Sequence, residues 1–265
     1  MSEWVAAGYF AYLWAVALVT LSGARRTQAA ACSLAAAVAV CLPQAMPGTT
    51  TWSTARDWLP ILYLGAGYWL SGLYFVAPMP SIEQRFLAAD VALYRRGLAT
   101  LIARAPRVLL EVLEFAYLTC FVFVPGGMVA LFFFGESAHA DRFWTLVLAS
   151  EFGSFGMLPW IQTRPPRDIE PVGSIDRRPI LMRRLNAFMV RRTSIGWNTF
   201  PSGHVAGSLA VAIAVSEAIP MLTLPLMLAA LLISISTITG RYHYAVDAVA
   251  GALLTLGLWC VLPVR

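Results

Sequence analysis

The chain contains 265 residues, of which 59% are hydrophobic and only 12% are charged. Because soluble domains carry about 25% charged residues, this composition excludes an ordinary soluble enzyme and indicates a membrane protein. The 19 basic residues are all arginine and outnumber the 14 acidic residues, which gives a net charge of +5. A helical span needs about 20 apolar residues, and such stretches occupy most of the chain, so we expect one integral membrane domain.

Apolar stretches along the chain predict an all-α fold, a polytopic membrane helical bundle with about eight transmembrane helices. In chain order the predicted spans are 4–22, 29–46, 57–76, 108–134, 141–160, 204–219, 221–239 and 243–262. The fourth stretch contains Pro125-Gly126-Gly127, which predicts either a kinked helix or a re-entrant break.

Two further stretches combine apolar and charged residues at helical spacing, which is typical of helices that lie along a membrane surface. The first, 80–107, sets Ile82, Phe86, Ala89, Leu93 and Leu101 against Glu83, Arg85, Asp90, Arg95, Arg96 and Arg104. The second, 180–192, sets Leu181, Leu185, Phe188 and Met189 against Arg183, Arg184, Arg191 and Arg192. We expect both to be interfacial amphipathic helices.

The arginines are distributed unevenly among the predicted loops. With eight spans, the loops at 23–28, 80–107, 161–203 and 240–242 share one side of the membrane, and they contain 16 of the 19 arginines. Because arginine-rich short loops mark the cytoplasmic side, we expect these loops in the cytoplasm, both termini outside, and a bacterial cytoplasmic membrane as the location.

Two of the three histidines lie in short motifs at span ends on this arginine-rich side. His204 closes Pro201-Ser202-Gly203-His204 at the start of the sixth span, where free helix N–H groups attract an anion such as phosphate. His243 and Asp247 are four residues apart at the start of the eighth span. We expect them on one helix face, where the carboxylate orients the imidazole and leaves its other nitrogen as a nucleophile.

Arginines at the end of the fifth span add planar donors that match phosphate oxygens in pairs. Arg164 and Arg167 lie in Thr163-Arg164-Pro165-Pro166-Arg167. Each motif alone is most often structural: a helix cap, a local hydrogen bond or a basic loop. Their occurrence together at span ends on one side favours a phosphate-binding catalytic site.

These residues, in this order, resemble the three-part signature of the type 2 phosphatidic acid phosphatase superfamily. Its usual forms are K-x6-R-P, P-S-G-H and S-R-x5-H-x3-D. The second form matches in full, whereas Met157 stands at the lysine position of the first and Thr237 at the arginine position of the third. The pair of segments TRPPR and GRYHYAVD is similar to a sub-branch that also holds inositol phosphorylceramide synthases.

The resemblance implies a role for each matched residue. His243 would attack phosphorus to form a phosphohistidine, Asp247 would hold its tautomer, and His204 would protonate the leaving oxygen. The oxygens would be held by Arg164, Ser202, Gly203 and Arg241, without a metal ion or other cofactor.

Two arginines are expected to compensate for the departures from the signature. Arg241 lies four residues after Thr237, and we place both on one helix face, so its long side chain would replace the missing arginine. Arg167 is our candidate for the missing lysine. We divide the chain into N-terminal spans with the interfacial helix, 1–140, and a phosphatase-like catalytic core, 141–265.

Three functions remain open. A membrane lipid phosphatase comes first, because this motif set is most often hydrolytic, and a phospholipid head-group transferase comes second. A transporter or scaffold comes third: Glu111, Glu114 and Glu151 lie in spans, where they would form an ion path or pair with boundary arginines. The expected partners are a lipid phosphate and membrane lipids, not nucleic acid, and the sequence indicates neither the lipid nor the oligomeric state. Many members of the superfamily place their catalytic loops outside, but the arginine count predicts the cytoplasmic side.

Overall fold

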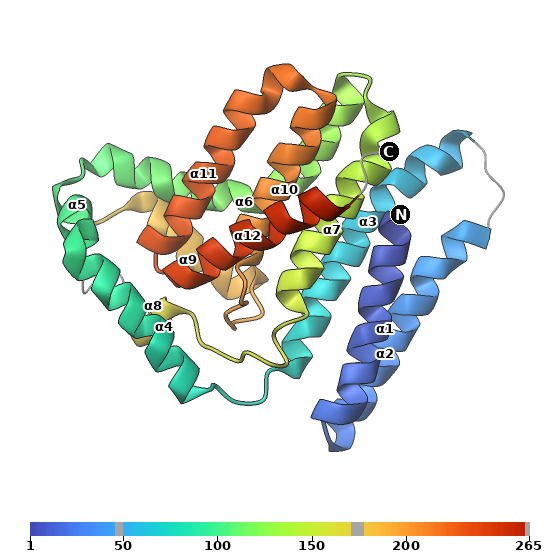
Figure 1. The fold of residues 1–265 in the computed structure, drawn as a ribbon, viewed down its shortest axis with the longest axis horizontal. Coiled ribbons are helices and arrows are strands. Elements are labelled where there is room, and N and C mark those ends of the chain that lie inside the picture. The colour runs from blue at the N-terminus through green and yellow to red at the C-terminus, as the bar shows by residue number, and fades with distance from the viewer. Residues whose placement is uncertain (46–49, 171–177, 263–265) are drawn as a thin grey trace.

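The computed structural model describes residues 1–45, 50–170 and 178–262, and the regular elements within these ranges are helices. The all-α prediction is therefore confirmed. The helices are α1 (Ser2–Thr20), α2 (Gly23–Cys41), α3 (Thr50–Ser71), α4 (Pro80–Leu93), α5 (Ala99–Arg104), α6 (Arg107–Phe133), α7 (Ala140–Phe155), α8 (Pro166–Ile169), α9 (Leu181–Thr193), α10 (Gly203–Ala218), α11 (Thr223–Thr239) and α12 (Ala245–Val261). Figure 1 shows how they are arranged.

Each predicted span coincides with one helix, although several ends are shifted by up to two turns. By length and hydropathy, α1, α6 and the segment Pro220–Thr239 can cross a membrane, and α10 and α12 are shorter apolar helices. These findings fit a membrane protein, and the count of eight spans remains a prediction.

The predicted re-entrant break in the fourth span is wrong, because α6 continues through Pro125. A Cβ atom on Gly127 would lie 2.7 Å from the ring of Phe143 and 2.8 Å from the side chain of Val211. This glycine therefore allows α6 to pack closely against α7 and α10, rather than ending the helix.

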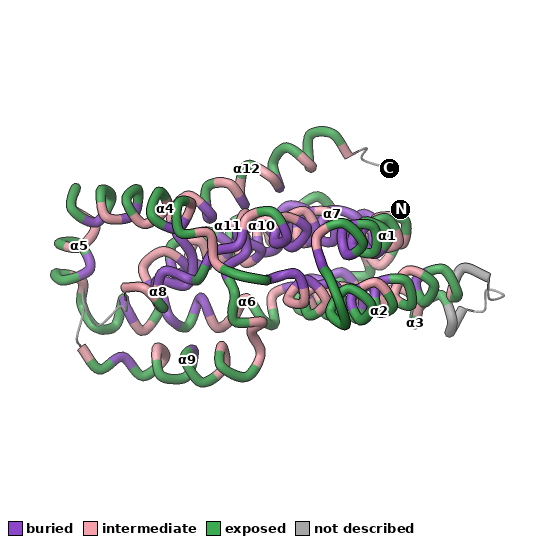
Figure 2. Tube along the Cα trace, turned by 90° about the horizontal axis from the view of Figure 1, so that it is seen from below, coloured by how far each residue is buried: buried purple, intermediate pink, exposed green. Residues whose placement is uncertain are grey.

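Helix α10 lies at the centre of the bundle and packs against α6, α7, α11 and α12. Most of its residues are buried, and many are alanine, glycine, serine or valine, whose small side chains let neighbouring helices approach closely. Figure 2 shows this buried centre, with exposed residues along α2, α4 and α9. The helix that begins with the predicted phosphate-binding motif is thus held on several sides.

One end of the bundle gathers the N-terminus, the start of α7, and the ends of α10 and α12 (Figure 1). The N-terminal ammonium group pairs with Asp141 at 2.8 Å. The Arg142 guanidinium pairs with Glu217 at 3.1 Å and donates to the carbonyl oxygen of Leu262 at 3.4 Å. These contacts bring together, at one end of the fold, the segments that the sequence placed on the side opposite the arginine-rich loops.

The opposite end gathers the arginine-rich segments, and α4 packs against them with its acidic residues. Glu83 and Asp90 are buried, whereas Leu93 and Leu101 are exposed. The prediction that the acids of this stretch lie on the polar, outward face of an amphipathic helix is therefore wrong. The reason is pairing: Glu83 binds Arg164 and Asp90 binds Arg241. Burial raises the pKa of Asp90 to about 6, although the N–H of Ala245 and the charge of Arg241 counteract the rise.

Helix α9 shows the expected amphipathic arrangement more closely. Asn186 is buried against α6, where its amide nitrogen donates to the carbonyl oxygen of Glu114 at 2.7 Å. Leu181, Leu185 and Phe188 are exposed on its outer surface. Such an outward apolar face fits a helix that lies on a membrane surface.

Candidate active site

A cavity of about 290 Å³ lies between α3, α6, α7, the start of α10 and the arginine-rich loops. Its polar lining includes Tyr117, Arg167, His204, Tyr242 and His243. An apolar flank from α3 and α6 is formed by Ile61, Leu64, Phe121, Phe123 and Val124. The cavity thus joins two of the predicted catalytic residues to a surface that suits an apolar chain.

His243 and Asp247 form the expected pair, but not on one helix face. Helix α12 begins at Ala245, so His243 lies in the preceding loop and Asp247 in the first turn. Nδ1 of His243 lies 3.4 Å from Oδ2 of Asp247, which also accepts from the amide nitrogen of Asn198 at 2.9 Å and from the N–H of Tyr244 at 3.0 Å. These bonds fix the carboxylate and leave Nε2 of His243 available for chemistry.

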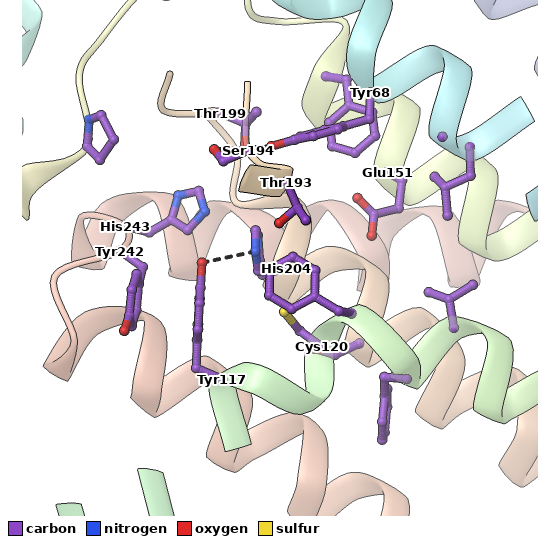
Figure 3. Close-up of a pocket in the computed structure, with 18 of the residues that line it drawn as sticks. Tyr68, Tyr117, Cys120, Glu151, Thr193, Ser194, Thr199, His204, Tyr242 and His243 are labelled. Carbon is purple, nitrogen blue, oxygen red and sulfur yellow. Dashed lines mark hydrogen bonds between the residues drawn. The ribbon is translucent and has the colours of Figure 1, made fainter. Parts of the chain in front are cut away.

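His204 lies in the first turn of α10, close to His243. The two imidazole centroids are 5.3 Å apart. The Tyr117 ring stacks on the His204 ring with centroids 5.2 Å apart, and its hydroxyl lies 3.3 Å from Nε2 of His204. Figure 3 shows both histidines beside Tyr117 and Tyr242 at one end of the cavity.

The loop environment of His243 keeps its imidazole neutral. Burial and, to a smaller extent, the positive charge of Arg167 together lower the pKa of His243 to about 3. A neutral imidazole retains the lone pair that a nucleophile needs at physiological pH.

Arg167 lines the cavity beside these residues. Its guanidinium carbon lies 5.6 Å from the centre of the Tyr242 ring, and its backbone N–H donates to the carbonyl oxygen of Arg241 at 3.0 Å. The candidate for the missing lysine is therefore near the histidines, and its phosphate-binding role remains a prediction.

Arg164 and Arg241 are directed elsewhere. The Arg164 guanidinium binds Glu83 with distances of 2.8 and 3.1 Å. Arg241 is buried, and its guanidinium binds Asp90 at 3.0 Å and Glu170 at 3.1 Å, beside a separate cavity of about 240 Å³. Neither guanidinium lines the histidine cavity.

The geometric reason given for Arg241 as a replacement is wrong. Helix α11 ends at Thr239, and Arg241 has a φ of 59°, in the left-handed region. Arg241 therefore lies beyond the helix and does not share a helix face with Thr237.

Ser202 and Gly203 also do not line the cavity and contribute instead to the start of α10. The Ser202 hydroxyl accepts from the N–H of Val205 at 3.5 Å. The backbone N–H of Ser202 donates to the carbonyl oxygen of Asp247 at 3.0 Å. The N–H of Gly203 donates to the Thr199 hydroxyl at 3.5 Å. Ser202 thus caps α10 and connects it to α12, which places His204 near His243.

The acids of α6 bind residues of α9 and Tyr242. Glu114 accepts from Nε of Arg183 at 2.8 Å and from the Tyr242 hydroxyl at 2.6 Å. Glu111 accepts from the backbone N–H groups of Leu181 and Met182, both at 2.9 Å. Glu111 and Glu114 therefore also pair with arginines, Arg107 and Arg183, whereas no such pair is present for Glu151 within the described residues.

Several residues of the site carried no sequence signal. Tyr117 is one of many aromatic residues in an apolar stretch, and Asn198 lies just outside the matched motif. Within the described ranges, no group of three or more histidine, cysteine or acidic side chains is arranged to hold a metal ion.

Comparisons with known proteins point to one family. The model of the PAP2 superfamily matches residues 85–261, from α4 to the end of α12. A PA-phosphatase related-family protein of Dictyostelium discoideum is 38% identical over 66 residues, which are 25% of this chain and 12% of that protein. The alignment thus covers about an eighth of that relative's length. No solved structure matches the chain significantly.

Proposed function

The chain belongs to the PAP2 superfamily, and from this premise we propose that it is a membrane lipid phosphatase that works through a phosphohistidine. The observation that carries the proposal is that His243, which pairs with Asp247, lines a cavity together with His204 and Arg167. A nucleophile, a group that orients it, a proton donor and a cation for the phosphate are the parts that phosphoryl transfer needs.

The first step would form the covalent intermediate. Nε2 of His243 attacks phosphorus, the bond from phosphorus to the ester oxygen breaks, and His204 gives its proton to that oxygen. Asp247 stabilises the positive charge that develops on the His243 ring, and Arg167 binds the phosphoryl oxygens.

The second step would release the product. Water attacks phosphorus and loses a proton to His204, the bond between phosphorus and Nε2 breaks, and inorganic phosphate leaves. His243 is then neutral again and His204 is protonated for the next cycle.

A lipid substrate is supported by the apolar flank of the cavity and by the long apolar helices of the chain. The direct test is phosphate release by detergent-purified protein from a panel of lipid phosphates and matched water-soluble phosphate esters. We expect release from the lipids with a higher kcat/KM. No release from any member of the panel would overturn the proposal.

One observation favours head-group transfer as a second candidate. Arg164 and Arg241 are paired with acids of α4, which leaves Arg167 as the one arginine among the described cavity-lining residues. A single guanidinium balances the one negative charge of a phosphodiester better than the two charges of a phosphomonoester. Adding a lipid alcohol or inositol to the assay tests this candidate, because a transferase would then form a new phospholipid instead of free phosphate.

The sidedness of the site is a further proposal, supported by the arginine-rich segments at the histidine end. We expect a single cysteine at Gln84 in a cysteine-free variant to be protected from an impermeant maleimide in intact cells. A cysteine at Ala138, between α6 and α7, should be labelled. Both positions are exposed. Labelling at Gln84 with protection at Ala138 would reverse the orientation.

A further inference from the structure

Glu151 lies near the C-terminal end of α7 and lines the same cavity as the histidines. Figure 3 shows its carboxylate directed into the cavity from the side away from His243. Within the described residues, no hydrogen bond or ion pair engages this carboxylate, whereas Glu83, Glu114 and Glu217 are each paired with an arginine. An unpaired carboxylate in a cavity wall is costly and is a candidate for binding a substrate group.

The first turns of α10 are shaped to receive this carboxylate. A Cβ atom on Gly203 would lie 2.8 Å from Oε2 of Glu151, and one on Gly207 would overlap Oε1. The two glycines are one turn apart, so together they leave a hollow on α10 that the carboxylate fills. Any larger residue at either position would displace it.

Two aromatic rings line the cavity on the same side as this carboxylate. A Cβ atom on Gly203 would also lie 2.8 Å from the ring of Phe155, which places that ring beside Oε2 of Glu151. The Tyr68 ring packs edge-on against Phe155 with centroids 5.3 Å apart, and both rings line the cavity. Aromatic faces next to a carboxylate form a surface that attracts a cation.

We infer that Glu151 binds an ammonium group of the substrate, so that the enzyme acts on phosphate esters of amino alcohols. The inference deepens the proposed function and rests on it for the reaction itself. Arg167 near the histidines and Glu151 across the cavity place a positive and a negative group where a zwitterionic phosphate ester has the opposite charges. The ammonium group would supply the partner that the carboxylate lacks within the protein.

Two kinds of phosphate ester could supply the ammonium group, and the choice of substrates distinguishes them. The amine lies on the leaving alcohol in a long-chain amino alcohol phosphate such as sphingosine 1-phosphate. It lies on the head group in a diester such as phosphatidylethanolamine. Phosphatidate and phosphatidylglycerol are the matched lipids without an amine.

The experiment compares turnover of sphingosine 1-phosphate with phosphatidate, and of phosphatidylethanolamine with phosphatidylglycerol. Each pair is measured with the wild-type protein and with Glu151→Gln. We expect wild type to prefer the amine-bearing lipid of at least one pair, and Glu151→Gln to reduce that preference in kcat/KM by roughly 30- to 100-fold. Glu151→Asp, which keeps the charge, should retain part of it. Glu136→Gln, which alters an acid outside the cavity, should leave the preference unchanged. An equal loss on both members of every pair would overturn the ammonium assignment.

A binding measurement separates this inference from the proposed reaction. In the His243→Ala background, O-phosphoethanolamine should raise the unfolding temperature more than ethyl phosphate does, and adding Glu151→Gln should remove the difference. If the difference is present but no substrate is turned over, the ammonium site stands and the proposed reaction fails. If lipids are turned over but the difference is absent, the reaction stands and the ammonium site is overturned.

Discussion

Replacing His243 by alanine is expected to abolish phosphate release from every lipid phosphate that the wild-type protein accepts. The reason is that Nε2 of His243 is the nucleophile in the proposed first step, while Nδ1 is turned toward Asp247. The measurement is release of labelled phosphate, together with acid-labile, base-stable labelling of the protein during turnover. Both should disappear in His243→Ala.

Two variants serve as comparisons for this result. His139→Ala removes the third histidine, which pairs with Glu136 in the turn before α7, and should retain wild-type turnover. His204→Ala should lower turnover by about 10²- to 10⁴-fold, because it removes a proton donor but leaves the nucleophile in place. Wild-type turnover in His243→Ala, or labelling at another residue, would contradict the nucleophile assignment.

Replacing Arg167 by alanine is expected to have the second largest effect, a loss of about 10²- to 10³-fold in kcat/KM. Charge on the phosphoryl oxygens increases during transfer, and Arg167 is the arginine that lines the cavity within the described residues. Arg167→Lys should recover part of the loss, since lysine supplies the charge without the paired donors of guanidinium. Steady-state kinetics with one lipid phosphate would measure both.

An arginine outside the cavity provides the control. Arg184 is exposed on α9, and Arg184→Ala should leave kcat/KM within about 3-fold of wild type, since exposed charges contribute little. A large loss in Arg164→Ala combined with near-normal kinetics in Arg167→Ala would contradict the assignment. It would mean that Arg164 leaves Glu83 to bind the phosphate.

The sequence predicted the fold class and the centre of the site, because both depend on local patterns. Hydrophobic stretches of helical length mark α1, α6 and α11 directly. His243 and Asp247 are four residues apart, so their contact follows from a short segment of chain. His204 could be placed near them because it belongs to a recognisable motif at the start of a helix.

The remaining contacts join segments that are distant in the sequence, and no local pattern reports them. The charged residues of α4 looked like the solvent side of an amphipathic helix, but Glu83 and Asp90 bind arginines that follow much later in the chain. The same bonds explain why Arg164 and Arg241 do not line the cavity. Tyr117 was hidden in an apolar stretch for the same reason, and the sequence identified Glu151 as an acid within a span but did not place it in the cavity.

The two acids of α4 give this helix the role of a spacer. Asp90 follows Glu83 by seven positions, and an α-helix advances about 10 Å over that length. Glu83 holds the segment that leads to Arg167, and Asp90 holds both sides of His243 through Arg241 and the N–H of Ala245. The distance between the two loops is thus set by the pitch of one helix. Inserting a single residue between the acids would turn one of them by about 100° around the helix axis. Glu83 and Asp90 could then no longer hold both loops at the same time.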